Sequence, residues 1–170
     1  MGNQQERSLA WLAGILDGEG SISVQVYNLP DKRVRLTPFI SLPNTDMAIL
    51  LEVERIFAEI GVESRRCKKP ITGNIGGKLT VEIIRVDGMR PVRKALEIVG
   101  PYLISGKRRN AEVILKYLDS RLKGGIKRDA KGQIRRSEYT RAEIELIASI
   151  RTHPSAKSSE AICQAPNVLG

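Results

Sequence analysis

The chain has 170 residues, 41% of them hydrophobic, which is long enough for one ordinary core and too short for two comfortable domains. Its 28 basic and 19 acidic residues leave a formal charge of +9, which favours a polyanionic partner. Nucleic acid is the leading candidate, and a ribosome-like or membrane-surface partner is the alternative. No run of about 18 apolar residues could cross a bilayer, and the N-terminus lacks a signal-peptide pattern. We therefore expect an intracellular protein that is not secreted.

Cysteine and histidine are sparse. Cys67 and Cys163 are far apart and form no CxxC motif, so neither a disulfide framework nor a zinc site is indicated. The single histidine, His153, lies in a polar C-terminal segment and gives little support to histidine-based catalysis. Any metal ion would therefore bind to carboxylates and water.

The predicted elements begin with a helix, whose apolar residues recur at helical spacing: Leu9, Leu12, Ile15 and Leu16. This helix is expected to end at Gly18. Two segments with alternating apolar and polar residues follow at 21–28 and 34–42, which predicts a hairpin with one polar face. A long amphipathic helix over 47–61 is expected next, with Asp46 as its N-cap.

The second half of the chain continues the alternation of hairpins and helices. The expected elements are a basic strand at 63–69, a glycine-rich turn at 72–77, an alternating strand at 78–86, and helices at 89–99 and 107–123. We expect residues 1–123 to form the core domain, 124–151 a basic linker with a short helix, and 152–170 a flexible or partner-bound polar tail. Thr140 and Glu143 form the capping box of the short helix. This order predicts an α+β fold with one antiparallel sheet.

The first helix carries a stripe of small residues. Ala10, Gly14 and Gly18 are spaced four residues apart and therefore share one side of the helix. A glycine inside a helix costs roughly 1 kcal/mol relative to alanine, so a compensating contact is expected. A second backbone could approach closely along this stripe. Because no second copy of the stripe occurs in the chain, pairing of two identical chains, a twofold homodimer, is predicted.

Two acids stand at the C-terminal end of the same helix. The helix dipole disfavours Asp17 and Glu19 there, and twofold symmetry would add repulsion between their copies. A hard divalent cation would relieve both effects, and Mg²⁺ fits because it needs only one or two carboxylates with phosphate and water. The alternative is a solvated helix stop with a glycine cap.

The stretch LAGILDGEG (12–20) resembles the signature of the LAGLIDADG homing endonucleases. The order of elements agrees with that family over roughly residues 7–123. The resemblance implies an αββαββα fold with a saddle-shaped antiparallel sheet lying in the DNA major groove. It also implies a homodimeric endonuclease of intron homing, which cuts both strands of a long, partly palindromic site in double-stranded DNA.

The resemblance also assigns roles to individual residues. The metal-binding acid falls on Glu19, where aspartate is more usual, with the backbone carbonyl of Gly18 as a further ligand. Asn44, or Thr45 if the register slips, corresponds to the polar residue that positions water. Lys107 corresponds to the basic residue near the scissile phosphate, and the alternative is a solvated helix start. Mg²⁺ is the expected cofactor, with Mn²⁺ or another divalent ion as a possible substitute. Asp17 is expected to support the helix end and to lie at the dimer interface with Ala10, Gly14 and Gly18.

Base recognition is expected from the polar faces of the four strands, since arginine and glutamine can read base edges bidentately. The candidate DNA-binding residues are Ser23, Gln25, Tyr27, Arg33, Arg35, Thr37, Arg66, Lys68, Lys78, Thr80 and Glu82. The alternative is that an antiparallel sheet always has one solvated face.

A different class of function stays open. Some relatives in this family are RNA-splicing maturases, which bind structured intron RNA without a cleavage centre, and others are DNA-binding proteins that do not cut. The intact acid at position 19 favours a nuclease.

Overall fold

The computed structural model describes residues 2–28, 34–70, 80–123, 127–128, 134–135 and 138–150. Its elements are α1 (Gly2–Glu19), β1 (Ser21–Asn28), β2 (Val34–Asn44), α2 (Met47–Glu59), β3 (Arg65–Pro70), β4 (Thr80–Asp87), α3 (Met89–Val99), the 3₁₀ turn η1 (Gly100–Tyr102), α4 (Gly106–Lys123), β5 (Lys127–Arg128), β6 (Ile134–Arg135) and α5 (Arg141–Ala148). The predicted α+β class and the αββαββα order are confirmed.

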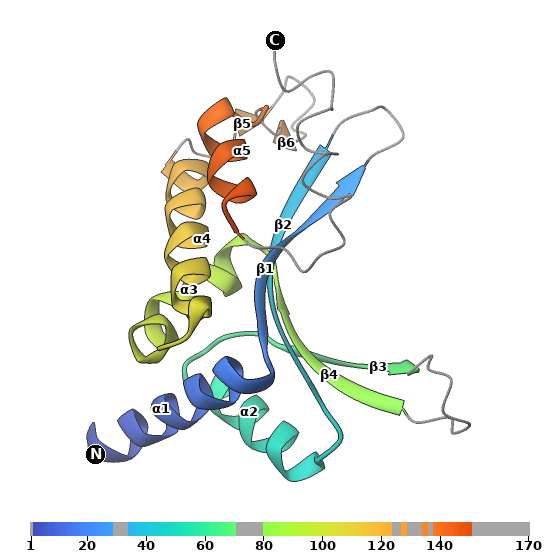
Figure 1. Cartoon of the computed structure of the whole chain (residues 1–170), viewed down its shortest axis with the longest axis vertical. Coiled ribbons are helices and arrows are strands. Elements are labelled where there is room, and N and C mark those ends of the chain that lie inside the picture. The colour runs from blue at the N-terminus through green and yellow to red at the C-terminus, as the bar shows by residue number, and fades with distance from the viewer. Residues whose placement is uncertain are drawn as a thin grey trace.

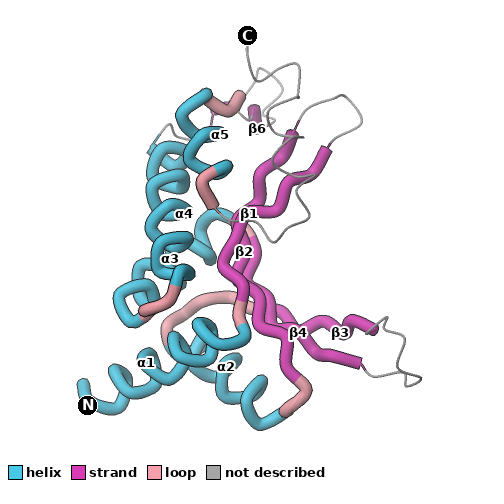
Figure 2. Tube along the Cα trace, in the orientation of Figure 1, coloured by secondary structure: helices cyan, strands magenta, loops and turns pink. Residues whose placement is uncertain are grey.

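The strands β1 to β4 form one antiparallel sheet in the order β1-β2-β4-β3. Figure 1 shows this sheet strongly twisted and curved, with β1 and β2 extending away from β3 and β4. The described helices cover its convex side, and the concave side carries no described helix (Figure 2). The sheet therefore has one face in the core and one open face.

Alternation along the strands explains which face is buried. The strand residues with the least exposure are all apolar and contribute to one core: Ile22, Val24, Leu36, Ile40, Leu42, Ile84 and Val86. The buried residues of α1 (Leu9, Leu12, Ala13 and Leu16) join the same core, as the helical spacing predicts. In the part of the chain that the structure describes, no helix is long and apolar enough to span a membrane.

The helix ends follow the predicted capping chemistry. Asp46 accepts a hydrogen bond from the Ala48 amide at 2.8 Å, and Gly61 follows α2 with a φ of 64°. Thr140 and Glu143 make both hydrogen bonds of the capping box of α5. The helix α1 ends at Glu19, one residue beyond the predicted end.

Some predictions fall on segments that the structure treats differently or does not describe. In the predicted linker, β5 and β6 pair as a short antiparallel ladder, which sequence reasoning missed. The glycine-rich turn at 72–77 and the tail at 152–170 lie outside the described residues.

Candidate active site

Gly20 makes the direct passage from α1 into β1 possible. Its amide donates to the Leu16 carbonyl at 2.9 Å, and a Cβ at this position would lie 2.8 Å from that same oxygen. Such a contact is too close for any side chain, so glycine is required here. The consequence is that Glu19, the last helical residue, stands immediately before the sheet.

Glu19 is exposed at the end of α1 and is oriented by a residue from the end of β2. The Asn44 side-chain amide donates from Nδ2 to Oε2 of Glu19 at 2.6 Å. Asn44 is itself fixed, because its Oδ1 accepts the backbone amide of Asp46 at 2.8 Å. Of the two sequence candidates, Asn44 is therefore the residue that contacts Glu19, while Thr45 is exposed.

Asp17 points in a different direction, toward the segment that leads into α4. Its carboxylate accepts hydrogen bonds from the Ile104 amide at 2.8 Å, the Ser105 amide at 3.3 Å and the Ser105 hydroxyl. Burial acts to raise the pKa of Asp17, but these hydrogen bonds outweigh it and leave the pKa below its usual value. Asp17 thus secures the beginning of α4 as well as belonging to the end of α1.

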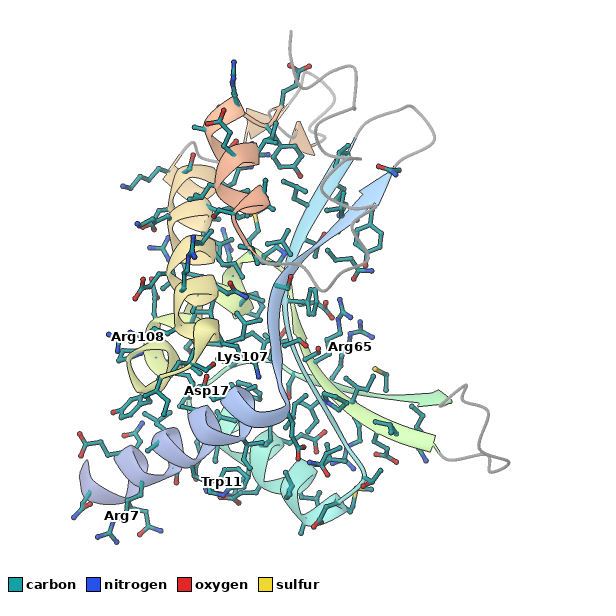
Figure 3. All side chains as sticks on the ribbon, in the orientation of Figure 1. Arg7, Trp11, Asp17, Arg65, Lys107 and Arg108 are labelled. Carbon is teal, nitrogen blue, oxygen red and sulfur yellow. The ribbon has the colours of Figure 1, made fainter. Side chains whose placement is uncertain are left out.

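Lys107 completes a reciprocal contact between the same two helices (Figure 3). Its Nζ donates to the carbonyls of Leu16 and Asp17, both at 2.7 Å. The ammonium thus provides hydrogen bonds to carbonyl oxygens in the last turn of α1, where helical partners run out. Partial burial lowers the pKa of Lys107, against the opposing charge of Asp17. The ammonium places positive charge beside a helix end that carries two acids and the negative end of the helix dipole.

The oxygen donors at the end of α1 suit Mg²⁺, provided that a substrate and water supply the remaining ligands. Among the described residues, no group of three or more His, Cys, Asp or Glu side chains could hold a metal ion. The exposed Glu19 carboxylate and the Gly18 carbonyl, in a turn whose carbonyls lack intrahelical partners, are hard oxygen donors. Mg²⁺ commonly binds one or two carboxylates together with phosphate oxygens and water.

The small-residue stripe of α1 lies on the surface. Ala10, Gly14 and Gly18 are exposed, and a Cβ added at either glycine would meet nothing within 4 Å. The Asp17 carboxylate is hydrogen-bonded within its own chain to the segment that leads into α4, and its place at the dimer interface stays a prediction. The stripe therefore has space above it for another backbone.

The first hairpin places its predicted residues on the open face. Cross-strand partners share a face, and the register pairs Gln25 with Thr37 and Tyr27 with Arg35. Ser23 lies on the same face, two positions from Gln25. Arg33 and Lys78 lie outside the described residues, as does the side chain of Thr80.

The prediction that Arg66, Lys68 and Glu82 share this face is wrong. Arg66 pairs across the ladder with Ile84, which is buried in the core, and Lys68 pairs with Glu82. Arg66 accordingly lies on the helix-covered face of the sheet, where its guanidinium donates to Glu54 of α2. The cause is the adjacent pair of isoleucines in β4, which leaves two possible alternations in the sequence.

Comparison with known proteins adds the family. A family model described as a LAGLIDADG-like domain matches residues 6–100, more than half of the chain. The chain belongs to the LAGLIDADG-like domain family. No curated protein sequence matches it significantly.

Solved structures share the fold of this LAGLIDADG-like protein at low identity. The archaeal intron-encoded homing endonuclease I-Vdi141I, complexed with DNA, is 17% identical with a TM-score of 0.61, over 93% of this chain and 96% of its own. The homing endonuclease I-TnaI is 14% identical with a TM-score of 0.62, over 92% of this chain and 97% of its own. The homing endonuclease I-CvuI, in complex with the I-CreI target, is 24% identical with a TM-score of 0.53, over 71% of this chain and 70% of its own.

The open face of this LAGLIDADG-like domain also holds polar residues that sequence reasoning missed. They are Arg65, Arg85 and Asp87: Asp87 accepts from both arginines, and Arg85 lies over the ring of Phe39. Figure 3 shows Arg65 on the concave side of the sheet. Ile84 and Val86 are buried, so the residues that alternate with them in β4, Arg85 and Asp87, must lie on the opposite, open face.

Proposed function

We propose that this LAGLIDADG-like protein is a homing endonuclease that cuts double-stranded DNA at specific sites, acts as a homodimer and uses Mg²⁺, with Mn²⁺ or another divalent ion as a substitute. One observation carries the proposal: an exposed carboxylate, Glu19, is held by Asn44 at the end of α1, where the chain passes into the curved sheet. The solved homing endonucleases with this fold include complexes with DNA, and two I-CvuI complexes were solved in the presence of Mg or Ca. The formal charge of +9 suits the same partner.

The residues at the helix end divide the chemistry among them. Glu19 and the Gly18 carbonyl would hold the cation, which when bound supplies Lewis-acid activation of a phosphoryl oxygen and a water of lowered pKa. Asn44 fixes the direction of the Glu19 carboxylate. Lys107, positioned beside the last turn of α1, would add positive charge for the phosphoryl oxygens.

The exposed stripe on α1 supports the proposed homodimer. Ala10, Gly14 and Gly18 offer a strip of nearly bare backbone, and the same strip on a second copy would fit it under twofold symmetry. Two copies of Glu19 would then stand at one end of the paired helices. Each copy would serve one strand of the DNA.

Selection from a randomised library of double-stranded DNA tests this function. The protein is incubated with the library in Mg²⁺ and, in parallel, in EDTA, and the cleaved molecules are sequenced. We expect cleavage only with the cation, at a long and partly palindromic sequence. Selective binding without cleavage in Mg²⁺ would instead support a DNA-binding protein, and preference for structured intron RNA would support a maturase.

A further inference from the structure

A row of polar side chains crosses the open face of the sheet at one level. The register aligns Ser21 of β1 with Ser41 of β2, Ser41 with Arg85 of β4, and Arg85 with Arg65 of β3. Two short side chains are thus followed by two long cationic ones. Because cross-strand partners share a face, both arginines lie on the same face as the serines, and Figure 3 shows Arg65 on the side of the sheet that the described helices leave open.

Arg85 is held by contacts from three strands. Its Nε donates to Asp87 at 2.6 Å, and its Nη2 donates to the Gln25 side chain of β1 at 2.7 Å. The guanidinium carbon lies 4.3 Å from the ring centre of Phe39 in β2. Only 21% of the Arg85 side chain is exposed, so its conformation is largely set before any ligand arrives.

Asp87 joins the two arginines. The other oxygen of its carboxylate accepts from Nε of Arg65 at 2.9 Å, and Nη2 of Arg65 forms an ion pair with the same oxygen at 2.9 Å. Hydrogen bonding and the charge of Asp87 raise the pKa of Arg65. Like charges directly opposite each other in a sheet repel, and Asp87 offsets that repulsion by giving one oxygen to each guanidinium.

The arrangement leaves donors for a ligand. A guanidinium has five N–H groups, and two on each arginine are directed to the contacts above. The three others on each have no partner among the described residues, and adjacent ones form a fork. In the major groove, the two acceptors O6 and N7 of guanine match such a fork.

Resting on the proposed function, we propose that Arg85 and Arg65 each select a guanine in every half-site of the DNA, with Asp87 as their positioning residue. Phosphate contacts need only a cation and tolerate a mobile side chain, whereas base reading requires a fixed donor pair. The held guanidinium of Arg85, standing within the sheet rather than at its rim, meets that requirement. Because the dimer is symmetric, the guanines appear at mirrored positions of the two half-sites.

Substitution of the arginines by glutamine tests the assignment, because glutamine prefers adenine. DNA bound from the randomised library is sequenced in Ca²⁺, which keeps binding separate from cleavage in Mg²⁺. Wild-type protein should require guanine at two mirrored pairs of positions. Arg85→Gln and Arg65→Gln should each lose one preference by roughly 5- to 100-fold, toward adenine, with the rest of the profile unchanged.

The matched control is Arg66→Gln, one residue from Arg65 and on the opposite face. It should leave the base profile intact. If Arg85→Gln fails to fold, Arg65→Gln still tests the proposal. The Arg65 side chain is 62% exposed on an edge strand, so its substitution should disturb folding least. Asp87→Asn should weaken both guanine preferences together while raising affinity for random DNA, since one negative charge is lost.

The outcomes separate this inference from the function on which it rests. Wild-type binding without guanine at mirrored positions, or unchanged profiles in both arginine variants, would overturn the inference even if cleavage in Mg²⁺ occurs. Affinity that falls uniformly for all sequences would show phosphate contacts and would overturn it as well. Guanine selection without cleavage would support the inference and remove only the nuclease.

Discussion

Two carboxylates at the end of α1 stand two positions apart and have opposite surroundings. Asp17 accepts hydrogen bonds from two amides and a hydroxyl at the start of α4, which reaches it from more than 80 residues along the chain. Glu19 is exposed and, among the described residues, accepts a side-chain hydrogen bond from Asn44. The first carboxylate is committed to the fold and the second remains available to a ligand.

This difference shows how a helix end can tolerate two acids in an unfavourable place. The carbonyls of the last turn and the helix dipole both add negative charge there. Lys107 offsets that charge by donating to two of these carbonyls, and Asp17 fixes the segment that carries Lys107. These contacts fix the end of α1, and therefore Glu19, but leave the Glu19 carboxylate accessible to a ligand. A precise binding site requires such support from the surrounding residues.

The largest expected effect is on the exposed carboxylate. Glu19→Gln keeps the shape and can still accept from Asn44, but it removes the charge that a cation needs. We expect the cleavage rate in Mg²⁺ to fall by a factor on the order of 10² or more, with DNA binding and folding retained. Single-turnover cleavage of a selected target measures the rate.

The matched control is Glu6→Gln, an exposed acid near the other end of α1. It should cut at the wild-type rate. A Glu19→Gln protein that still cuts at that rate would remove the proposed role of Glu19 and with it the contrast to Asp17.

The next effect concerns the exposed side of α1. Gly14→Leu fits a single chain, since a Cβ there meets nothing within 4 Å, and leucine favours helix over glycine. In a dimer packed through the stripe, the added side chain would separate the helices. We expect the dissociation constant of the dimer to rise roughly 5- to 100-fold in sedimentation.

Gln5→Leu, exposed on the first turns of α1, serves as the control and should leave the dimer intact. An undiminished dimer in Gly14→Leu would mean that the copies of Glu19 are not brought together through this stripe. The comparison of the two acids would then hold within one chain only.

The sequence predicted the local parts of this picture well. The helix and hairpin order, the caps at Asp46 and Thr140, and the open face of the first hairpin all follow from spacing within one element. In β1, the apolar residues Ile22 and Val24 alternate with polar ones without ambiguity, so a single face could bury them.

The parts that were wrong or missed depend on contacts between distant elements. In β4, Ile83 and Ile84 are adjacent, and either could begin the buried alternation. A shift by one residue exchanges the faces of the strand, so the prediction placed Glu82 rather than Arg85 on the open face and, with it, Arg66 rather than Arg65 of the paired strand β3. The contact between Asp17 and Ser105 spans 88 residues, and no periodicity within either helix could indicate it.

The smallest effect concerns the committed carboxylate. Asp17→Ala removes the acceptor of the Ile104 and Ser105 amides and leaves Lys107 without its nearby counter-charge. Loss of a comparable cap costs about 1–2 kcal/mol, and we expect the free energy of unfolding in urea to fall by about that amount. Glu19→Ala, tested in the same way without metal, should stay within about 0.5 kcal/mol of wild type, as is usual for exposed positions. Equal losses in the two variants would mean that both acids serve the fold, and the exposed position of Glu19 would no longer single it out for chemistry.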